Sequence, residues 1–161
     1  MPIEHVEYME AITKRYSALG YAPYGWIQAD SPPALTPLTK PLNECRIGMM
    51  STSGAYVKGQ TAYFYKDDTS TRAIPKNTPK DDIHFSHLTE NYLEDPRRDP
   101  DCILPLTALS RLEAEGVIGD LADEVYSCMG GIYSQRRVIE ELIPDLTANF
   151  RAQKVDAAFL V

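Results

Sequence analysis

The first residues that could bind a charged small molecule form a hydroxyl-rich segment after an apolar stretch. Ser51, Thr52, Ser53 and Gly54 directly follow residues 45–50, which have the composition of a buried strand. Hydroxyls and backbone amides gathered in a turn can cradle a carboxylate or a phosphate. The segment lacks the GxxxxGK[ST] spacing of a P-loop. An ordinary polar turn fits the same residues, so substrate binding here is a hypothesis.

A second segment has a similar position in the sequence. Cys128 and Met129 end an apolar stretch over 125–129, and Gly130 and Gly131 follow. A helix that begins just beyond would lower the pKa of the Cys128 thiol and make it a candidate nucleophile. A small buried side chain is the other interpretation of a cysteine in a strand. We expect Met129, Gly130 and Gly131 to bind substrate beside Ser51–Gly54, at one edge of the sheet.

Two histidines flank the end of a short strand predicted at 83–85. His87 is a candidate for orienting the substrate or for acid–base catalysis, although a solvated polar loop also fits this region. The nearby acidic residues match no specific ligand spacing, so no metal site is predicted.

The elements that would position these residues indicate an α/β fold. Apolar residues recur at helical spacing over 4–19, and Gly20 follows as a helix terminator. Five prolines then predict an extended arm to residue 43. From Pro105 onward the order helix, strand, helix, strand favours a right-handed βαβ unit. We therefore predict one α/β domain over 1–161, with a partial doubly wound, mostly parallel sheet; the helix and arm occupy 1–43 and the body 44–161.

Within this body the boundaries come from apolar patterns and terminating residues. One helix runs from Pro105 to Gly116, and another starts at Ser134 with a kink expected at Pro144. Two connections, 51–82 and 86–104, are much longer than usual and mark the carboxyl ends of strands as the place to look for a site. The strands are expected at 45–50, 83–85, 125–129 and 155–161.

Composition excludes several classes of function. The 161 residues carry a net charge of −7, and basic residues do not cluster beyond the pairs Arg97–Arg98 and Arg136–Arg137, which argues against nucleic acid and anionic membranes as partners. Neither a secretory signal nor a stretch long enough to span a membrane is evident. Three widely spaced cysteines suggest free thiols in a reducing cytoplasm.

An ordered set of motifs adds a resemblance to a known family. The segments that carry it are 35–42, Ile47–Val57, Asp68–Ser70, Arg72–Pro75, Ser86–His87, Arg98–Cys102 with Pro105, Leu109–Leu112, Glu115–Gly119, Cys128–Gly131 and Val155–Leu160. Through these segments, over roughly residues 21–161, the chain resembles the selenoprotein B family of glycine, sarcosine, betaine and D-proline reductases. Near residue 88 this sequence departs from the family's usual pattern.

The resemblance implies a component of a reductase that cleaves the C–N bond of an amino acid or methylated amine. A selenolate or thiolate would attack the α-carbon, and in the glycine and D-proline systems a pyruvoyl group on a partner subunit can hold the substrate amine. The reactive selenocysteine or cysteine is expected just after strand 155–161, on a continuation. A split gene, a fragment ended at a selenocysteine codon and a degenerate homologue all fit. The alternative function is a non-catalytic subunit that binds a small ligand or another protein.

Association with another chain is a further expectation. The predicted strand 155–161 is apolar on both faces, as in a strand covered from both sides. Tyr21, Tyr24 and Trp26 in the arm are common interface anchors. We therefore expect a second chain that carries the rest of the active site, or a homo-oligomer, and not a free monomer.

Overall fold

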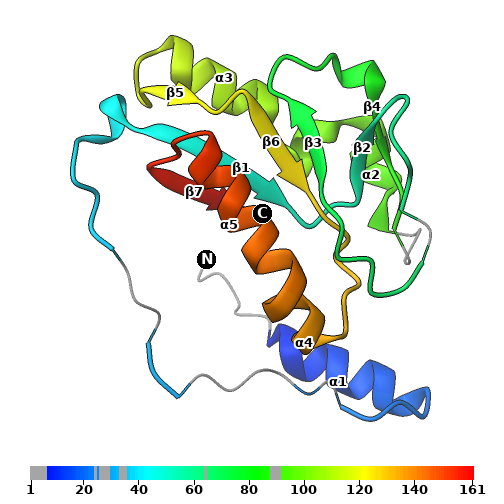
Figure 1. The fold of residues 1–161 in the computed structure, drawn as a ribbon. Helices are drawn as coiled ribbons and strands as arrows, with labels where there is room; N and C mark the ends of the chain where they lie inside the picture. The colour runs from blue at the N-terminus through cyan, green and yellow to red at the C-terminus, as the bar shows by residue number, and fades with distance from the viewer. Residues whose placement is uncertain (1–6, 24, 26–29, 33–35, 64, 88–91) are drawn as a thin grey trace, which may run out of the picture. The chain divides into compact units, whose positions relative to one another are not determined.

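The computed structural model describes all residues except 1–6, 24, 26–29, 33–35, 64 and 88–91 (Figure 1). The chain divides into two compact units, residues 1–36 and 37–161. The first unit contains helix α1, Tyr8–Ala18, none of whose residues is buried. Gly20 follows with a φ of 84°, as expected for a glycine that ends a helix. Tyr24 and Trp26 lie outside the described residues.

A mostly parallel sheet forms the centre of the second unit. Strand β1, Arg46–Ser51, pairs in parallel with β5, Asp120–Leu121, with β6, Glu124–Ser127, and with β7, Ala157–Leu160. Strand β3, Arg72–Pro75, pairs antiparallel with the outer edge of β6. The predicted α/β class with a mostly parallel sheet is confirmed.

Backbone hydrogen bonds show which edge of β1 each neighbour occupies. The carbonyl of Ile47 accepts from the amide of Ala122, just after β5, and the carbonyl of Ser51 accepts from the amide of Cys128, just after β6. The carbonyl of Met50 accepts instead from the amide of Val161, just after β7. Because carbonyls point to alternate edges along a strand, β5 and β6 share one edge of β1 and β7 takes the other. Strand β1 therefore lies between β6 and β7, and its carboxyl end is flanked on both sides.

Helices cover both faces of this sheet. Helix α3, Leu106–Ala114, contributes Leu106 and Leu109 to the buried cluster that contains Met49 of β1. On the opposite face, the helical connection from β6 to β7 consists of α4, Gln135–Arg137, the π-helical segment η5, Val138–Leu142, and α5, Ile143–Ala152 (Figure 1). Phe150 of α5 packs edge-on against Tyr126, with ring centroids 5.7 Å apart.

Most of the remaining elements lie within or beside the two long connections. Strand β2, Ala55–Val57, pairs antiparallel with β4, Ile83–Phe85. The charged residues after position 93 form helix α2, Glu94–Arg98, in which the first turn is acidic and the last turn is basic, an arrangement that stabilises a helix. The described residues also form the 3-10 turns η1, Leu42–Glu44, η2, Lys80–Asp82, and η4, Pro100–Cys102.

The expected helix termini are largely correct. Gly116 follows α3 with a φ of 69°, and the Ser134 hydroxyl caps α4 by accepting from the amide of Arg137. Pro144 lies in the first turn of α5, directly after the π-helical residues. Proline has no amide to donate to the preceding turn of a helix. The helix is irregular where a kink was expected, because the residues before Pro144 form a wider π turn.

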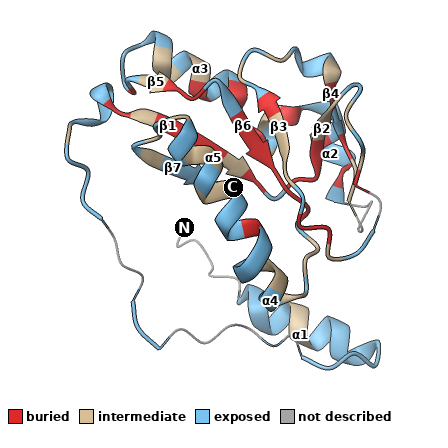
Figure 2. Cartoon of the chain, viewed as in Figure 1, coloured by how far each residue is buried: buried red, intermediate tan, exposed pale blue. Residues whose placement is uncertain are grey.

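Strand β7 is largely uncovered within this chain, so the expected cover by a second chain stays a prediction. Phe159 and Leu160 are 47% and 63% exposed, and among the described residues β7 pairs only with β1. Figure 2 shows the contrast with buried β1 and β6. In the described part of the chain, no helix is long and apolar enough to cross a membrane.

Candidate functional site

The two predicted segments meet at the carboxyl ends of β1 and β6. Ser53 and Met129 form an antiparallel bridge, and the amide of Gly54 donates to the carbonyl of Cys128 at 2.9 Å. Gly54 has a φ of 67°, and the oxygen of Ser86 lies where its Cβ would be, so only glycine fits. The predicted juxtaposition of Ser51–Ser53 with Gly130–Gly131 is confirmed.

His87 joins the same edge from the end of β4. A methyl group on Gly130 would lie 2.9 Å from Nε2 of His87 and 2.7 Å from the carbonyl oxygen of Thr52. Gly130 and Thr52 are exposed, whereas His87 and Gly131 are half-buried. These four residues form the solvent-facing part of the edge, and we call them the glycine edge.

The buried serines of the first segment hold the backbone. The Ser51 hydroxyl donates to the carbonyl of Ile103 at 2.8 Å. Ser53 is 1% exposed, and its hydroxyl lies 3.4 Å from that of Ser127. Even the exposed Thr52 hydroxyl donates to the carbonyl of Val161 at 3.2 Å. Direct ligand contact by Ser51 or Ser53 stays a prediction; their observed bonds fix the shape of the turn.

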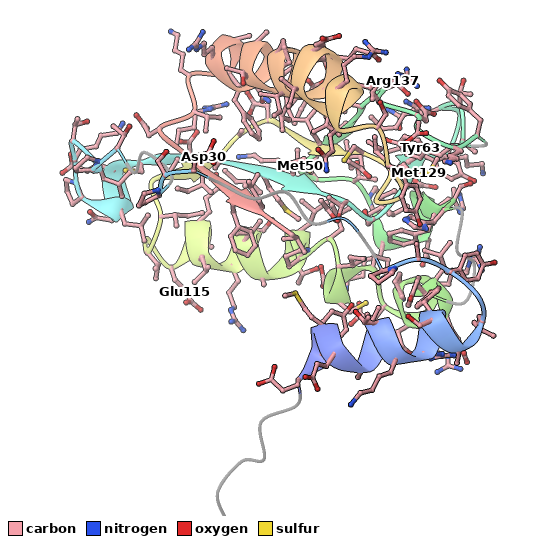
Figure 3. All side chains as sticks on the ribbon, turned by 90° about the horizontal axis from the view of Figure 1, so that it is seen from below. Asp30, Met50, Tyr63, Glu115, Met129 and Arg137 are labelled. Atoms are coloured by element: carbon pink, nitrogen blue, oxygen red, sulfur yellow. The ribbon has the colours of Figure 1, made fainter. Side chains whose placement is uncertain are left out.

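Ser127 is a site residue that sequence reasoning missed. It is fully buried, and its hydroxyl accepts from the amide of Ala55 at 2.8 Å. The hydroxyl of Tyr63 donates to the Ser127 carbonyl at 2.8 Å, and burial raises the pKa of Tyr63, so the phenol stays protonated. Tyr63 and Met129 lie at the end toward which β1 points (Figure 3). A serine within a strand gives no sequence signal for this role.

A charged network holds the turn that follows Gly131. The carboxylate of Asp67 accepts from the amides of Tyr133 and Ser134. Glu141 accepts from Thr69 at 2.6 Å and pairs with Arg137 at 2.8 Å. The hydrogen bond from Arg137, with that from Thr69, lowers the pKa of Glu141 to about 2. The loop at 67–69 is thus fastened to the start of the helical connection.

The thiols of Cys128 and Cys102 do not have the environment of an activated nucleophile. Cys128 is 1% exposed, and burial raises its pKa to about 11. Cys102 is exposed, but desolvation and then the nearby Asp95 and Asp99 raise its pKa too. Within the described ranges, no group of three His, Cys, Asp or Glu side chains could hold a metal ion.

Together these features define an α/β protein with a rigid, glycine-lined edge at the carboxyl ends of its parallel strands, where α/β proteins commonly bind ligands. Residues 89–161 match the family model described as "Glycine/sarcosine/betaine reductase selenoprotein B". The chain thus resembles the selenoprotein B family, as its motifs predicted.

Two curated proteins are similar over most of the chain. One is D-proline reductase subunit gamma of Acetoanaerobium sticklandii, which is 28% identical over 135 residues, covering 84% of this chain and 55% of the relative. Another is glycine reductase complex component B subunit gamma of Symbiobacterium thermophilum, 29% identical over 131 residues, covering 77% of this chain and 30% of the relative. The chain thus spans about half or less of each relative's length. No solved structure matches it significantly.

Proposed function

We propose that this chain is a component of a B-type reductase that cleaves the C–N bond of an amino acid or a methylated amine. Its relatives are named as subunits of D-proline and glycine reductases. Their names support a role as one subunit among several, with partner chains completing the active site. The particular substrate within this class is part of the proposal and is the subject of the experiment below.

The observation that carries this proposal is the glycine edge. Thr52, His87 and Gly130 come from three separate parts of the sequence, and they meet where two adjacent parallel strands end. Because Gly130 has no side chain, His87 and the carbonyl of Thr52 can approach its backbone closely, and this contact holds the imidazole at the exposed edge. An imidazole can hydrogen-bond a substrate carboxylate or amine, and histidine is a common general acid or base in catalysis. We assign it to orienting the substrate or to acid–base catalysis.

In this proposal the attacking nucleophile is not one of the cysteines of this chain. A nucleophilic thiol must be ionised, and the raised pKa of Cys128 keeps it protonated near neutral pH. We therefore place the reactive selenocysteine or cysteine on a segment outside this sequence. A pyruvoyl group on a partner subunit would hold the substrate amine in a glycine- or D-proline-type system.

A second candidate function is a subunit that binds a small amine or carboxylate without turnover. The absence of an activated thiol among the described residues favours it. Both candidates use the glycine edge for binding, and they differ only in whether the assembled complex releases an amine.

Calorimetric titration tests binding at this edge. The wild-type chain, alone and with a co-expressed partner, is titrated with glycine, sarcosine, betaine and D-proline. In Gly130→Ala the new methyl group would lie within 3.0 Å of the Thr52 carbonyl oxygen and of Nε2 of His87 and would displace the imidazole, so we expect at least about a tenfold loss of affinity, equal to about 1.4 kcal/mol. Gly25→Ala is the matched control, since its methyl group would meet nothing within 4 Å.

The outcomes separate clearly. A folded Gly130→Ala protein that binds as tightly as the wild type would remove the glycine edge from the proposal. A second variant, His87→Gln, keeps hydrogen-bonding capacity but cannot carry a positive charge. Its affinity should fall for the same ligands. If no ligand of the panel binds even with a partner present, both candidate functions fail.

A further inference from the structure

Tyr63 is bonded to both chain segments that lead to the glycine edge. Its side chain is buried, and its hydroxyl donates to the carbonyl of Ser127 at 2.8 Å. Its own backbone carbonyl accepts from the hydroxyl of Ser86. Ser127 lies three residues before Gly130, and Ser86 directly precedes His87. A single residue thus connects the end of β6, which leads to Gly130, with the end of β4, which leads to His87.

Arg72 holds the ring of Tyr63 in place. The guanidinium carbon of Arg72 lies 4.2 Å from the centre of this ring, and its Nε donates to the carbonyl of Thr61 at 2.7 Å. Arg72 in β3 is also the register partner of Ser127 in β6. A largely buried guanidinium over an aromatic face stabilises that arrangement. The ring therefore has a fixed orientation, with its hydroxyl directed at the Ser127 carbonyl.

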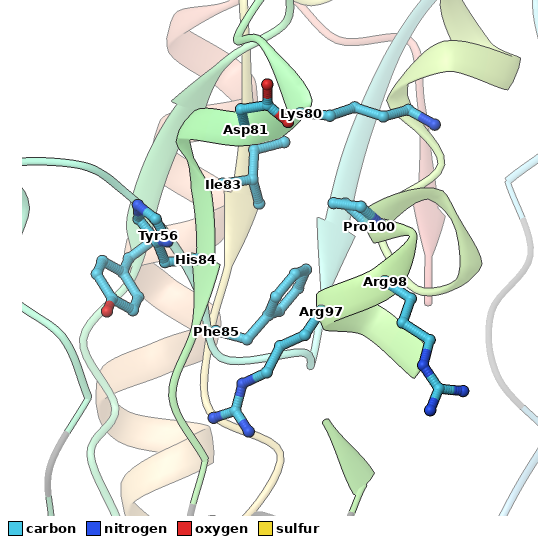
Figure 4. Close-up of a pocket in the computed structure, with 9 residues that line it drawn as sticks. All are labelled: Tyr56, Lys80, Asp81, Ile83, His84, Phe85, Arg97, Arg98 and Pro100. Atoms are coloured by element: carbon cyan, nitrogen blue, oxygen red, sulfur yellow. The ribbon is translucent and has the colours of Figure 1, made fainter. Parts of the chain in front are cut away.

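Strand β4 is held in the fold by its own packing. Phe85 is 6% exposed and points from β4 toward Pro100 (Figure 4). Because neighbouring side chains of a strand point to opposite faces, His84 lies on the other face, where its ring and that of Tyr56 have centroids 5.7 Å apart. Loss of a hydrogen bond at Tyr63 should leave these contacts of β4 in place.

His87 lies beyond the end of β4, so strand pairing does not fix its position. The strand ends two residues before it, and the amide of Ser86 donates to the carbonyl of Gly54 at 3.0 Å. The Ser86 hydroxyl provides a second fixed point through Tyr63. On the other side, a Cβ at Gly130 would lie 2.9 Å from Nε2 of His87. The imidazole is so close to this backbone that a shift of either segment alters the contact.

We propose that Tyr63 is a positioning residue of the glycine edge: its hydrogen bonds to Ser127 and Ser86 set the contact between Gly130 and the imidazole of His87. Because Tyr63 is only 2% exposed, it acts through His87 and not by touching a ligand. The inference rests on the proposed function for its consequence in catalysis, but the contact that it describes can be measured without any ligand.

NMR of the histidine side chains in the full chain, without ligand, measures this contact. Long-range proton–nitrogen correlation spectra show the histidine rings, and the signals of His87 are those lost in His87→Gln. Tyr63→Phe removes only the hydroxyl and keeps the ring and the backbone carbonyl. We expect the His87 signals to shift by more than a linewidth or to broaden. The His84 signals should stay unchanged, because β4 keeps its own packing.

Tyr126→Phe is the matched control. Tyr126 is also a buried tyrosine, 4% exposed, and belongs to β6. Its hydroxyl accepts from the side-chain amide of Gln153 at 3.0 Å, at the end of α5. The substitution removes the same atom from the same kind of buried ring, but away from the glycine edge. It should leave the His87 signals unchanged.

Ser86→Ala tests the second hydrogen bond. It removes the hydroxyl that donates to Tyr63 and keeps the amide that donates to Gly54, so it should also shift the His87 signals. Should Tyr63→Phe fail to fold, Ser86→Ala decides alone. In calorimetric titrations, a ligand of the panel that binds the wild type should bind Tyr63→Phe at least about threefold more weakly, and should bind Tyr126→Phe as tightly as the wild type.

Several results would overturn the inference. These are unchanged His87 signals in a folded Tyr63→Phe protein or, where that variant does not fold, in Ser86→Ala, equal shifts of His84 and His87, or an equal shift of His87 in Tyr126→Phe. A panel in which no ligand binds refutes the proposed function, and the NMR result still decides on Tyr63. Conversely, unchanged His87 signals together with ligand binding refute positioning by Tyr63 and leave the glycine edge as a binding site.

Discussion

Gly48 is the position where the packing of α5 on the central strand can be tested most sharply. A Cβ added at Gly48 would lie 2.8 and 2.9 Å from two ring carbons of Phe150 and 3.0 Å from a methyl carbon of Val155. Contacts this short force the Phe150 ring off its position against Tyr126. Overpacking of a filled interior costs about 1–3 kcal/mol, so Gly48→Ala should lower the free energy of unfolding by that amount.

Urea unfolding followed by circular dichroism measures this cost. Phe150→Leu removes the ring carbons that clash, so the double variant Gly48→Ala/Phe150→Leu should be more stable than the sum of the single effects predicts, by about 0.5–3 kcal/mol. Gly25→Ala is again the control. A Gly48→Ala protein within about 0.5 kcal/mol of the wild type, or strictly additive effects, would show that α5 does not pack on β1 as described.

Two further predictions concern the buried groups behind the glycine edge. The pKa of Cys128 is raised to about 11 from an ordinary value of 9.0. As pH rises, the thiol of the unfolded chain therefore loses its proton before the thiol of the folded chain does, which favours unfolding. Between about pH 9 and 11 the free energy of unfolding should fall by roughly 2 kcal/mol more in the wild type than in Cys128→Ala. Equal slopes for the two proteins in urea unfolding across this range would contradict the buried thiol. Ser127→Ala removes the hydroxyl that accepts from the Ala55 amide, so we expect the free energy of unfolding to fall by about 1–2 kcal/mol. A variant as stable as the wild type would mean that the Ser53 hydroxyl fully replaces Ser127 as the acceptor.

The main strands could be predicted because each is an apolar stretch that ends in a turn. Residues 45–50 and 125–129 correspond to β1 and β6, with shifts of one or two residues at the ends. Strands β2 and β3 could not be found in the same way. Strand β2 has only three residues, and β3 contains Pro75, which is tolerated because the strand lies at an edge of the sheet.

The position of the candidate site could be predicted, but its chemistry could not. The carboxyl ends of adjacent parallel strands meet at one edge, so Ser51–Gly54 and Met129–Gly131 had to lie close together. Whether a hydroxyl faces solvent depends on its register in the sheet and its partners. Ser51 points inward to the Ile103 carbonyl, a contact across 52 residues that no local pattern announces. The contact of His87 with Gly130 is likewise a product of the tertiary fold.

The most direct test of the central claim is amine release by the assembled complex. The chain is combined anaerobically with its co-expressed partner subunits, a dithiol reductant and glycine, sarcosine, betaine or D-proline, and the released amine, or the ring-opened amino acid from D-proline, is measured. We predict that one of these substrates is reductively cleaved only when the chain is present, and that Gly130→Ala greatly reduces the rate while Gly25→Ala does not. Turnover that is unchanged when the chain is omitted would contradict its assignment as a reductase component.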